Sequence, residues 1–121
     1  PTIALGKTWM SAPSLLKKWQ DEIFTFLSKT PAVAGKPLTV VTTTGSEYEA
    51  YRSGGRNRFT TDELLRPYQV SAIHSGMSWQ TPIVVYGMGT ADAGKNIAEG
   101  ANLYKQRVEM LIGNSNAGNN W

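Results

Sequence analysis

The sequence predicts an α/β protein whose helices cover both faces of a parallel sheet. Two apolar, β-branched runs, residues 38–43 and 83–86, alternate along the chain with longer stretches of helical periodicity. Strands that alternate with helices favour parallel pairing and a doubly wound, three-layer α/β/α arrangement. Because two strands are too few for such a sheet, we expect the 121 residues to be the carboxyl-terminal portion of a domain, without its first strands. The chain begins at Pro1 in place of Met, as expected of a processed chain or a piece of a longer one.

Composition excludes several classes of protein. With 40% hydrophobic and 17% charged residues, the chain is too apolar and too weakly charged to be disordered. Its apolar runs are far shorter than the about 20 residues of a membrane-spanning helix. No Cys and a lone His74 predict no metal site, and a net charge of +3 is too small to indicate a nucleic-acid partner. Without Cys or a secretory signal, a cytoplasmic location is expected.

The first predicted helix begins near Pro13, whose missing N–H is tolerated in a first turn. Apolar residues then recur at spacings of three, four and one, with polar residues between them, and the helix is expected to end near Ser28. The segment 1–11 is short and irregular in pattern, and residues 3–5 are expected to be at most the remnant of a strand.

A buried strand and a long loop follow. Residues 38–43 are apolar and β-branched after the turn-forming residues 35–37, which is typical of a buried strand. Residues 47–60 carry charge and two adjacent glycines but no apolar period. A loop of that length in a compact domain is usually functional.

Thr60 or Thr61 is expected to cap the second helix, which ends at Gly76. Pro67 predicts a kink or a late start within it. A second strand at 83–86 is bounded by Pro and Gly.

The third helix is predicted over about residues 92–112 by apolar residues at a period near 3.6. Residues 113–121 contain few apolar side chains and are expected to form a flexible tail. The predicted organisation is therefore the carboxyl-terminal part of one domain over 1–112, followed by that tail.

The first candidate binding loop is Thr43-Thr44-Gly45-Ser46, directly after the first predicted strand. Ligands of open α/β sheets lie beyond the carboxyl ends of the strands. Hydroxyls and backbone N–H groups of this loop could therefore bind the edge of a planar polar ligand. The alternative is an ordinary polar turn after a strand, and composition alone favours that alternative.

Aromatic side chains flank this loop or the helix starts around it. Rings near a pocket can stack on a flat cofactor, whereas Trp9 and Tyr68 could simply belong to the core, as we expect for Tyr68. The flanking residues are Trp9, Tyr48, Tyr51 and Tyr68.

Three arginines, Arg52, Arg56 and Arg58, lie in the long loop beside Gly54 and Gly55. Bidentate recognition of a phosphate is one interpretation of this cluster. A solvated charged loop is the other, and it is the default.

Common catalytic motifs are missing. Residues 87–94 do not fit the G-x-G-x-x-G spacing, and the chain contains no P-loop and no G-x-S-x-G. The carboxylates are scattered over helix faces, and His74 has no plausible triad partner. Any chemistry is therefore expected to belong to a cofactor.

Several segments, in order, resemble the flavodoxin-like NAD(P)H:quinone oxidoreductases. Residues 9–21, W-M-S-A-P-S-L-L-K-K-W-Q-D, are similar to that family's Y-W-x-S-x-P-x-x-L-K-x-W-x-D segment. Residues 43–46, T-T-G-S, with Tyr51 eight residues after Thr43, resemble its T-T-G-G…Y loop. Matches to its next helix, last strand and last helix follow. The nearest branch includes oxidoreductase subunits of glutathione-gated potassium efflux systems and a general stress protein.

The resemblance implies a flavodoxin-like fold, a homodimer, and FMN or FAD bound at the carboxyl end of the sheet. It further implies that NAD(P)H donates a hydride through the flavin to a quinone-like acceptor in a two-electron reduction. By the resemblance, Tyr51 is the catalytic tyrosine beside the ring. The implied flavin-binding residues are Trp9, Met10, Thr43, Thr44, Gly45 and Ser46.

This chain departs from the family pattern at several positions. Ser46 replaces the second Gly of the loop, and Asn57 stands where some members carry a catalytic His. The family's flavin-phosphate loop has no counterpart in these residues. Two other functions therefore stay open: a regulatory accessory subunit of a potassium efflux transporter, held at the inner membrane face through that partner, and a truncated module without flavin.

Overall fold

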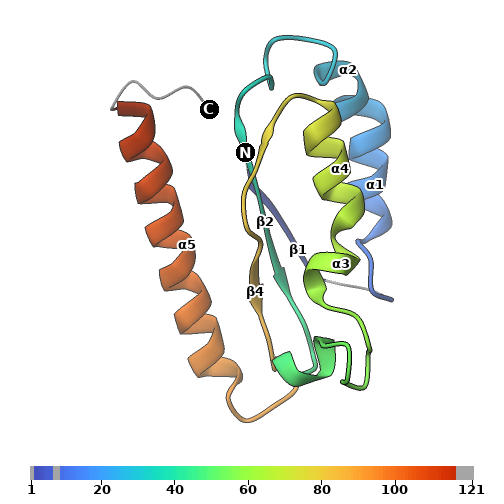
Figure 1. The fold of residues 1–121 in the computed structure, drawn as a ribbon, viewed down its shortest axis with the longest axis vertical. Coiled ribbons are helices and arrows are strands. Elements are labelled where there is room, and N and C mark those ends of the chain that lie inside the picture. Colours follow the sequence, from blue (N-terminus) through green and yellow to red (C-terminus); the bar gives the residue numbers. More distant parts are fainter. Residues whose placement is uncertain (1, 7–8, 117–121) are drawn as a thin grey trace.

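The computed structural model describes residues 2–6 and 9–116, and it contains a small parallel sheet. Strand β2 (Pro37–Thr43) lies in the middle of the sheet, with β1 (Thr2–Gly6) on one side. On the other side, β3 (Ser78–Trp79) pairs with the start of β2 and β4 (Ile83–Val85) pairs with its end. All three pairings are parallel, as the alternation of strands and helices predicts (Figure 1).

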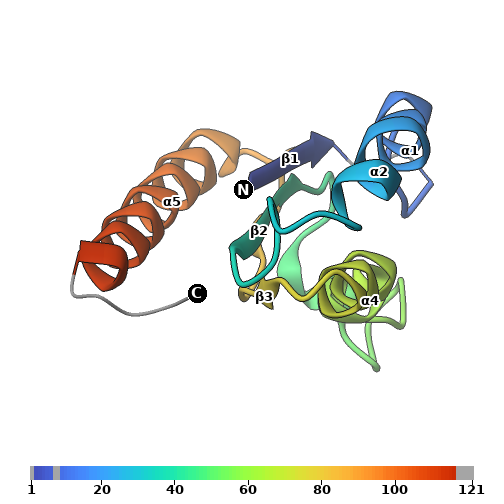
Figure 2. The same cartoon turned by 90° about the horizontal axis from the view of Figure 1, so that it is seen from above.

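Helices cover both faces of this sheet. On one face lie α1 (Ser14–Trp19), which continues through η1 (Gln20–Phe24) into α2 (Thr25–Leu27), and α4 (Arg66–His74). The long helix α5 (Ala93–Asn116) lies on the opposite face, as the view from above shows (Figure 2). The predicted α/β class, with helices on both sides of a parallel sheet, is therefore confirmed.

The core is built around β2. Val40 is fully buried against Leu65 and Tyr68, and Leu38 packs with Ala72 and other side chains on the same face. A parallel strand covered on both faces is expected to be apolar and β-branched along its whole length, as residues 38–43 are. The expectation that Tyr68 belongs to the core is correct.

Helix α5 approaches the other face closely at Gly100. A Cβ at this position would overlap Val85 Cγ2. Farther along the helix, the Tyr104 hydroxyl donates to Thr2 Oγ1 at 3.2 Å. Helix α5 therefore spans the sheet from β4 to β1.

Two strands differ from the sequence prediction. Residues 2–6 form a complete strand, not a remnant, because they pair with β2 from Thr2↔Thr39 to Gly6↔Thr43. The two-residue strand β3 is not predicted at all. Both strands form by pairing with a segment distant in the chain, and the local sequence pattern does not indicate such pairing.

The helices differ in smaller ways. The first helix contains the π-helical turn η1, which no sequence pattern signals, and ends close to Ser28 as predicted. The second begins at Thr61 and breaks between α3 (Thr61–Leu64) and α4, with Pro67 in the first turn of α4, so of the two expected effects of Pro67, a kink or a late start, the structure shows an interruption and not a late start. Helix α5 includes residues 113–116, and the rest of the predicted tail, 117–121, lies outside the described residues. Across the described ranges, no helix has both the length and the apolar character required to cross a membrane.

Candidate functional site

The carboxyl ends of the strands meet at one end of the sheet. Gly6 of β1 is opposite Thr43, and Thr43 is opposite Val85 of β4. The loop 43–46, the 3₁₀ turn η2 (Tyr48–Tyr51) and the loop 86–89 all follow directly from this end. Ligands of open parallel sheets bind at such a position.

Loops 43–46 and 86–89 are joined to each other by backbone hydrogen bonds. The Thr44 N–H donates to Val85 O at 2.9 Å, and the Met88 N–H donates back to Thr44 O at 2.9 Å. The Gly87 and Gly89 N–H groups donate to Ser46 O at 2.9 Å and to Gly45 O at 3.0 Å. Gly87 has a φ of 70°, a conformation that glycine adopts without steric cost. The two loops therefore form one rigid double loop.

Within this double loop, the side chain of Thr44 serves the loop itself. Thr44 is buried, and its hydroxyl donates to Ser46 O at 2.8 Å. By contrast, within residues 2–6 and 9–116 neither the Gly45 nor the Ser46 N–H donates a hydrogen bond. A Cβ placed on Gly45 would have no atom within 4 Å. The loop thus offers two backbone donors beside an open glycine surface, which fits the polar edge of a planar ring such as a flavin.

Trp9 and Met10 follow β1 at the same end of the molecule. Both have a positive φ, 50° and 63°, a conformation that is uncommon for residues other than glycine and clusters at functional sites. Trp9 is 96% exposed, so the interpretation of Trp9 as a core residue is wrong. Because Trp9 follows β1 at the carboxyl end of the sheet, its exposed indole is available to a flat ligand bound at that end.

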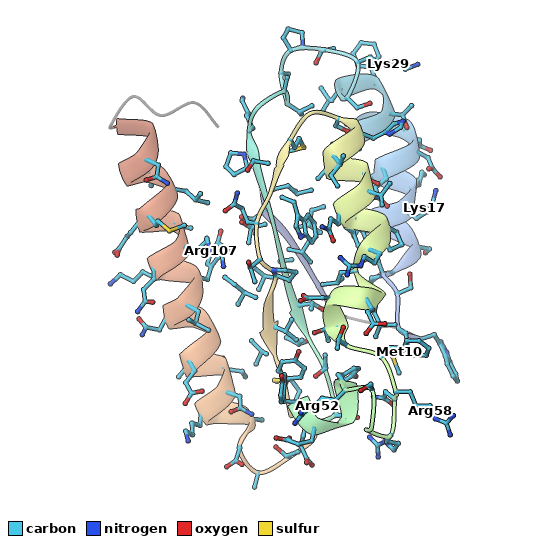
Figure 3. All side chains as sticks on the ribbon, in the orientation of Figure 1. Met10, Lys17, Lys29, Arg52, Arg58 and Arg107 are labelled. Carbon is cyan, nitrogen blue, oxygen red and sulfur yellow. The ribbon has the colours of Figure 1, made fainter. Side chains whose placement is uncertain are left out.

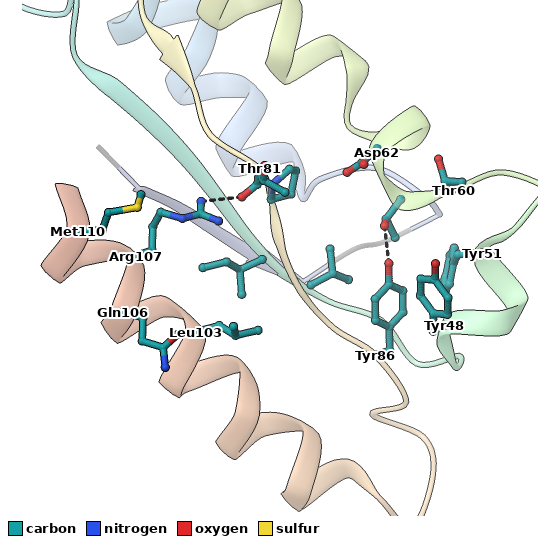
Figure 4. A pocket seen from close by; sticks show the side chains of 14 residues that line it. Tyr48, Tyr51, Thr60, Asp62, Thr81, Tyr86, Leu103, Gln106, Arg107 and Met110 are labelled. Carbon is teal, nitrogen blue, oxygen red and sulfur yellow. Dashed lines mark hydrogen bonds between the residues drawn. The ribbon is translucent and has the colours of Figure 1, made fainter. Parts of the chain in front are cut away.

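Tyr86 of the double loop packs with two other tyrosines and a threonine (Figure 4). The Tyr86 ring lies 5.3 Å from that of Tyr48 and 5.8 Å from that of Tyr51, centroid to centroid. The Tyr86 and Thr61 hydroxyls form a hydrogen bond of 2.6 Å. Burial raises the pKa of Tyr86, and the hydrogen bond with Thr61 opposes this shift. Tyr51 is only 5% exposed, so its ring belongs to the packed layer.

A groove of about 600 Å³ extends from these tyrosines along the outer edge of β4. Helix α5 forms its far wall, where Arg107 Nη1 donates to Thr81 O at 2.7 Å. None of residues 43–46 lines this groove, although Tyr48 and Tyr51 do. Tyr86 of the double loop also lines the groove, so the groove borders the double loop at Tyr86 and not at residues 43–46.

Two features of the long loop were not predicted. Arg56 Nη2 donates to Ser46 Oγ, which ties the arginine loop to the candidate binding loop. Asn57 Nδ2 is buried and has no hydrogen-bond partner in the part of the chain that the structure describes. No local sequence signal marks either feature, because both depend on how residues 47–60 fold back on the sheet.

The structure therefore brings Thr43–Ser46, Met10, Trp9 and Tyr51 to one end of the sheet. Tyr86 joins them, although the sequence marks it only as the end of a strand. His74 is exposed at the end of α4, away from this group. The roles of Tyr51 and of the six flavin-binding candidates remain predictions.

Comparison with known families decides the classification. The profile of a family described as having a flavodoxin-like fold matches residues 5–108. The chain belongs to this flavodoxin-like family. The resemblance drawn from the motifs is thus confirmed at the level of the family.

Curated relatives share this family's sequence pattern. General stress protein 14 of Bacillus subtilis is 39% identical over 84% of this chain, and the uncharacterized NAD(P)H oxidoreductase YdeQ of the same organism is 36% identical over 85%. The potassium-efflux ancillary protein KefG of Serratia proteamaculans is 42% identical over 63%. The chain spans 60%, 54% and 44% of the lengths of these three relatives.

Solved structures share the flavodoxin-like fold. A chain from a thermophilic tryptophan halogenase structure of Streptomycin violaceusniger gives a TM-score of 0.77 at 35% identity, over 88% of this chain and 64% of that one. An NADPH-quinone reductase from P. pentosaceus gives 0.72 at 28% identity, over 82% and 62%. General stress protein 14 of Treponema denticola, in complex with FMN, gives 0.78 at 24% identity, over 91% and 64%.

Replacing Tyr86 by Phe is expected to lower the free energy of unfolding by about 1 kcal/mol, because the buried Thr61 hydroxyl loses its partner.

Burial raises the pKa of Tyr86 and of Tyr68 above the usual 10.0. The unfolded chain therefore ionises first, and the stability that these groups contribute is complete below pH 10 and lost as the pH rises through their folded-state values. Urea denaturation from neutral pH to about pH 11 measures both effects. An alkaline loss of stability as steep in the Phe variant as in the unmodified protein would contradict a contribution from Tyr86.

Proposed function

We propose that the protein is a flavin-dependent NAD(P)H oxidoreductase that reduces a quinone-like acceptor by two electrons. The observation that carries this proposal is that the Gly45 and Ser46 N–H groups, on the carboxyl-end loop of a flavodoxin-like sheet, donate no hydrogen bond within the described part of the chain. The names of YdeQ and of the P. pentosaceus quinone reductase support the reaction class. The Treponema protein of the same fold was solved with FMN, so FMN is the flavin proposed here.

The residues of the double loop would hold the polar edge of the ring. The Gly45 and Ser46 N–H groups are the proposed donors, and the exposed Thr43 hydroxyl can add a third bond. When bound, the flavin supplies the chemistry of accepting a hydride from NAD(P)H and passing two electrons on. Fixed backbone donors stabilise negative charge at such an edge without reorganising, because the double loop is already hydrogen-bonded.

The aromatic residues exclude water around the ring in this proposal. Trp9 is nearly fully exposed and, with Met10, is available to cover one face. Tyr48 and Tyr51 pack on Tyr86 of the double loop, so this tyrosine layer would support the loop around the ring. We further propose a homodimer in the cytoplasm, whose oligomeric state is measured by light scattering.

Visible absorbance tests the proposed function directly. The purified protein is mixed with FMN and desalted, and NADPH is then added without oxygen. We expect yellow flavin to be retained and to bleach with NADPH, and a quinone such as menadione to accelerate NADPH oxidation. Failure to retain any flavin overturns the proposal, and Thr43–Ser46 then has only a structural role.

An accessory role is the second candidate function, favoured by the 42% identity with KefG, whose name describes an ancillary protein of a potassium efflux system. The same experiment separates the two. If flavin binds but no quinone accelerates NADPH oxidation, the accessory role of a potassium transporter subunit is supported. A protein that binds neither flavin nor NADPH would be a module without redox function.

Replacing Tyr51 by Phe is expected to slow hydride transfer from NADPH about tenfold, because the family position beside the ring loses its hydroxyl. The fold should persist, since the buried ring and its packing on Tyr86 are kept. Stopped-flow flavin bleaching measures the rate, and Tyr48→Phe, which alters an exposed hydroxyl on the same turn, is the control. Equal rates in the two variants would remove Tyr51 from the catalytic role.

A further inference from the structure

The arginine loop, residues 52–58, carries positive charge that the described part of the protein does not neutralise. Ion pairs among the described residues join lysines to carboxylates four positions along a helix, and none includes Arg52, Arg56 or Arg58. Glu47 and Glu49 precede the loop but form no ion pair with it. All three arginine side chains belong to exposed residues. The charge is therefore available to a ligand.

This charge lies at the end of the sheet where the ring is proposed to bind. Arg56 reaches the double loop through its bond to Ser46 Oγ. Figure 3 shows Arg52 and Arg58 at the same end of the molecule as Met10, whereas Lys29 lies at the opposite end. A ligand held by these arginines can thus extend toward the Gly45–Ser46 loop.

The backbone of the arginine loop is held in place. The Gly55 N–H donates to Arg52 O at 2.9 Å, and the Arg58 N–H donates to Gly55 O at 3.1 Å. The Asn57 N–H donates to Ala50 O at 2.9 Å, which fastens the loop to η2. Arg58 has a φ of 63°, and the Arg52 guanidinium lies 5.8 Å from the centroid of the Tyr48 ring. Such order lowers the entropy lost when a ligand binds.

We propose that the arginine loop binds the phosphate groups of the nicotinamide dinucleotide and favours NADPH over NADH. This rests on the proposed function, because the nicotinamide must reach a ring held at Gly45–Ser46. The guanidinium fork matches the oxygens of a phosphate and stays charged at every physiological pH. NADPH carries a 2′-phosphate in addition to the diphosphate, so it gains more than NADH from three arginines that form no ion pair among the described residues. The phosphate of the flavin itself offers the same chemistry, and the experiment separates the two sources.

Arg58→Gln and Arg56→Gln test the proposal, with Lys29→Gln as a control that removes one charge from the opposite end. Each arginine variant should weaken the binding of 2′-phospho-ADP-ribose about tenfold in calorimetry, the loss expected for one hydrogen bond to a charged group. The binding of ADP-ribose should weaken less. This measurement needs neither flavin nor turnover.

Kinetics with the flavin-loaded protein supply the second readout. The KM for NADPH should rise about tenfold in each arginine variant, while reduced nicotinamide riboside, which has no phosphate, should be oxidised as before. Affinities for FMN and riboflavin should not change in Arg58→Gln, because Arg58, unlike Arg56, has no side-chain bond to the double loop among the described residues. If 2′-phospho-ADP-ribose and NADPH bind the arginine variants as they bind Lys29→Gln, the loop is only a solvated charged surface and the proposal is wrong.

Two other outcomes are also decisive. If FMN binding weakens in the variants while riboflavin binding does not, the loop holds the flavin phosphate and the nicotinamide assignment is overturned. If the unmodified protein retains no flavin but binds 2′-phospho-ADP-ribose through these arginines, the proposed function fails while the phosphate site stands. The two proposals can therefore fail separately.

Discussion

Replacing Gly45 by Val is expected to reduce flavin affinity at least about 100-fold while leaving the fold intact. The branched side chain would stand between the ring and two backbone donors, Gly45 N–H and Ser46 N–H, and each hydrogen bond to a charged edge contributes about 1.5–3 kcal/mol. The protein itself tolerates the change, because a Cβ at Gly45 meets no atom within 4 Å. Gly45 is also absent from the residues with positive φ, so its backbone conformation suits a side chain.

Fluorescence titration of FMN measures the affinity of the Gly45 variant, and urea denaturation measures its stability. Gly54→Val is the matched control, since Gly54 is equally open, also lacks a positive φ, and lies outside the double loop. We expect Gly54→Val to bind FMN normally. Unchanged FMN affinity in the Gly45 variant would place the ring elsewhere on the protein.

The parts of the fold that sequence predicts well are those with local signals. Residues 38–43 form β2 because a continuous β-branched run between turn residues suits a strand buried on both faces. The sequence signal for the Thr60 cap is a Thr followed three residues later by Glu63, and the structure shows the reciprocal hydrogen bonds of a capping box. Helix α5 begins where its 3.6-residue period begins.

The parts that sequence misses depend on neighbours distant in the chain. Residues 2–6 become a strand only because β2 offers an edge, and β3 exists only where Ser78 and Trp79 meet Pro37 and Leu38. The hydrophobic periodicity of one segment does not identify the strand with which that segment pairs.

The same contrast holds for the candidate site. Thr43–Ser46 could be predicted because the carboxyl end of a parallel strand is a known ligand position. Two other features could not be predicted: the joining of this loop to residues 86–89, and the bond from Arg56 to Ser46. Each connects segments ten or more residues apart, and such contacts depend on the folded backbone and side-chain geometry. Fold class and first loop therefore follow from sequence, whereas the second half of the site needs the structure.

Replacing Gly55 by Ala is expected to lower the free energy of unfolding by about 3 kcal/mol, although the residue lies in a loop. A Cβ at Gly55 would overlap Glu49 O and lie 2.7 Å from Ala50 O and 2.9 Å from Ala50 C. These are backbone atoms, which cannot turn aside as a flexible side chain can. The loop would have to move away from η2 and lose the bond from Asn57 N–H to Ala50 O.

Gly54→Ala is the control for this prediction, because the neighbouring glycine has no atom within 4 Å of its Cβ position. Urea denaturation of the two variants should give midpoints that differ by most of the expected loss, with Gly54→Ala near the unmodified protein. Equal midpoints would contradict the close packing of residue 55 on η2. The loop carries Arg56 and follows Tyr51, so its displacement should also weaken 2′-phospho-ADP-ribose binding and slow flavin reduction together. Gly55 positions the loop that carries Arg56 and follows Tyr51. A loss of stability without either effect would therefore show that the packing of this loop is not needed for its proposed role.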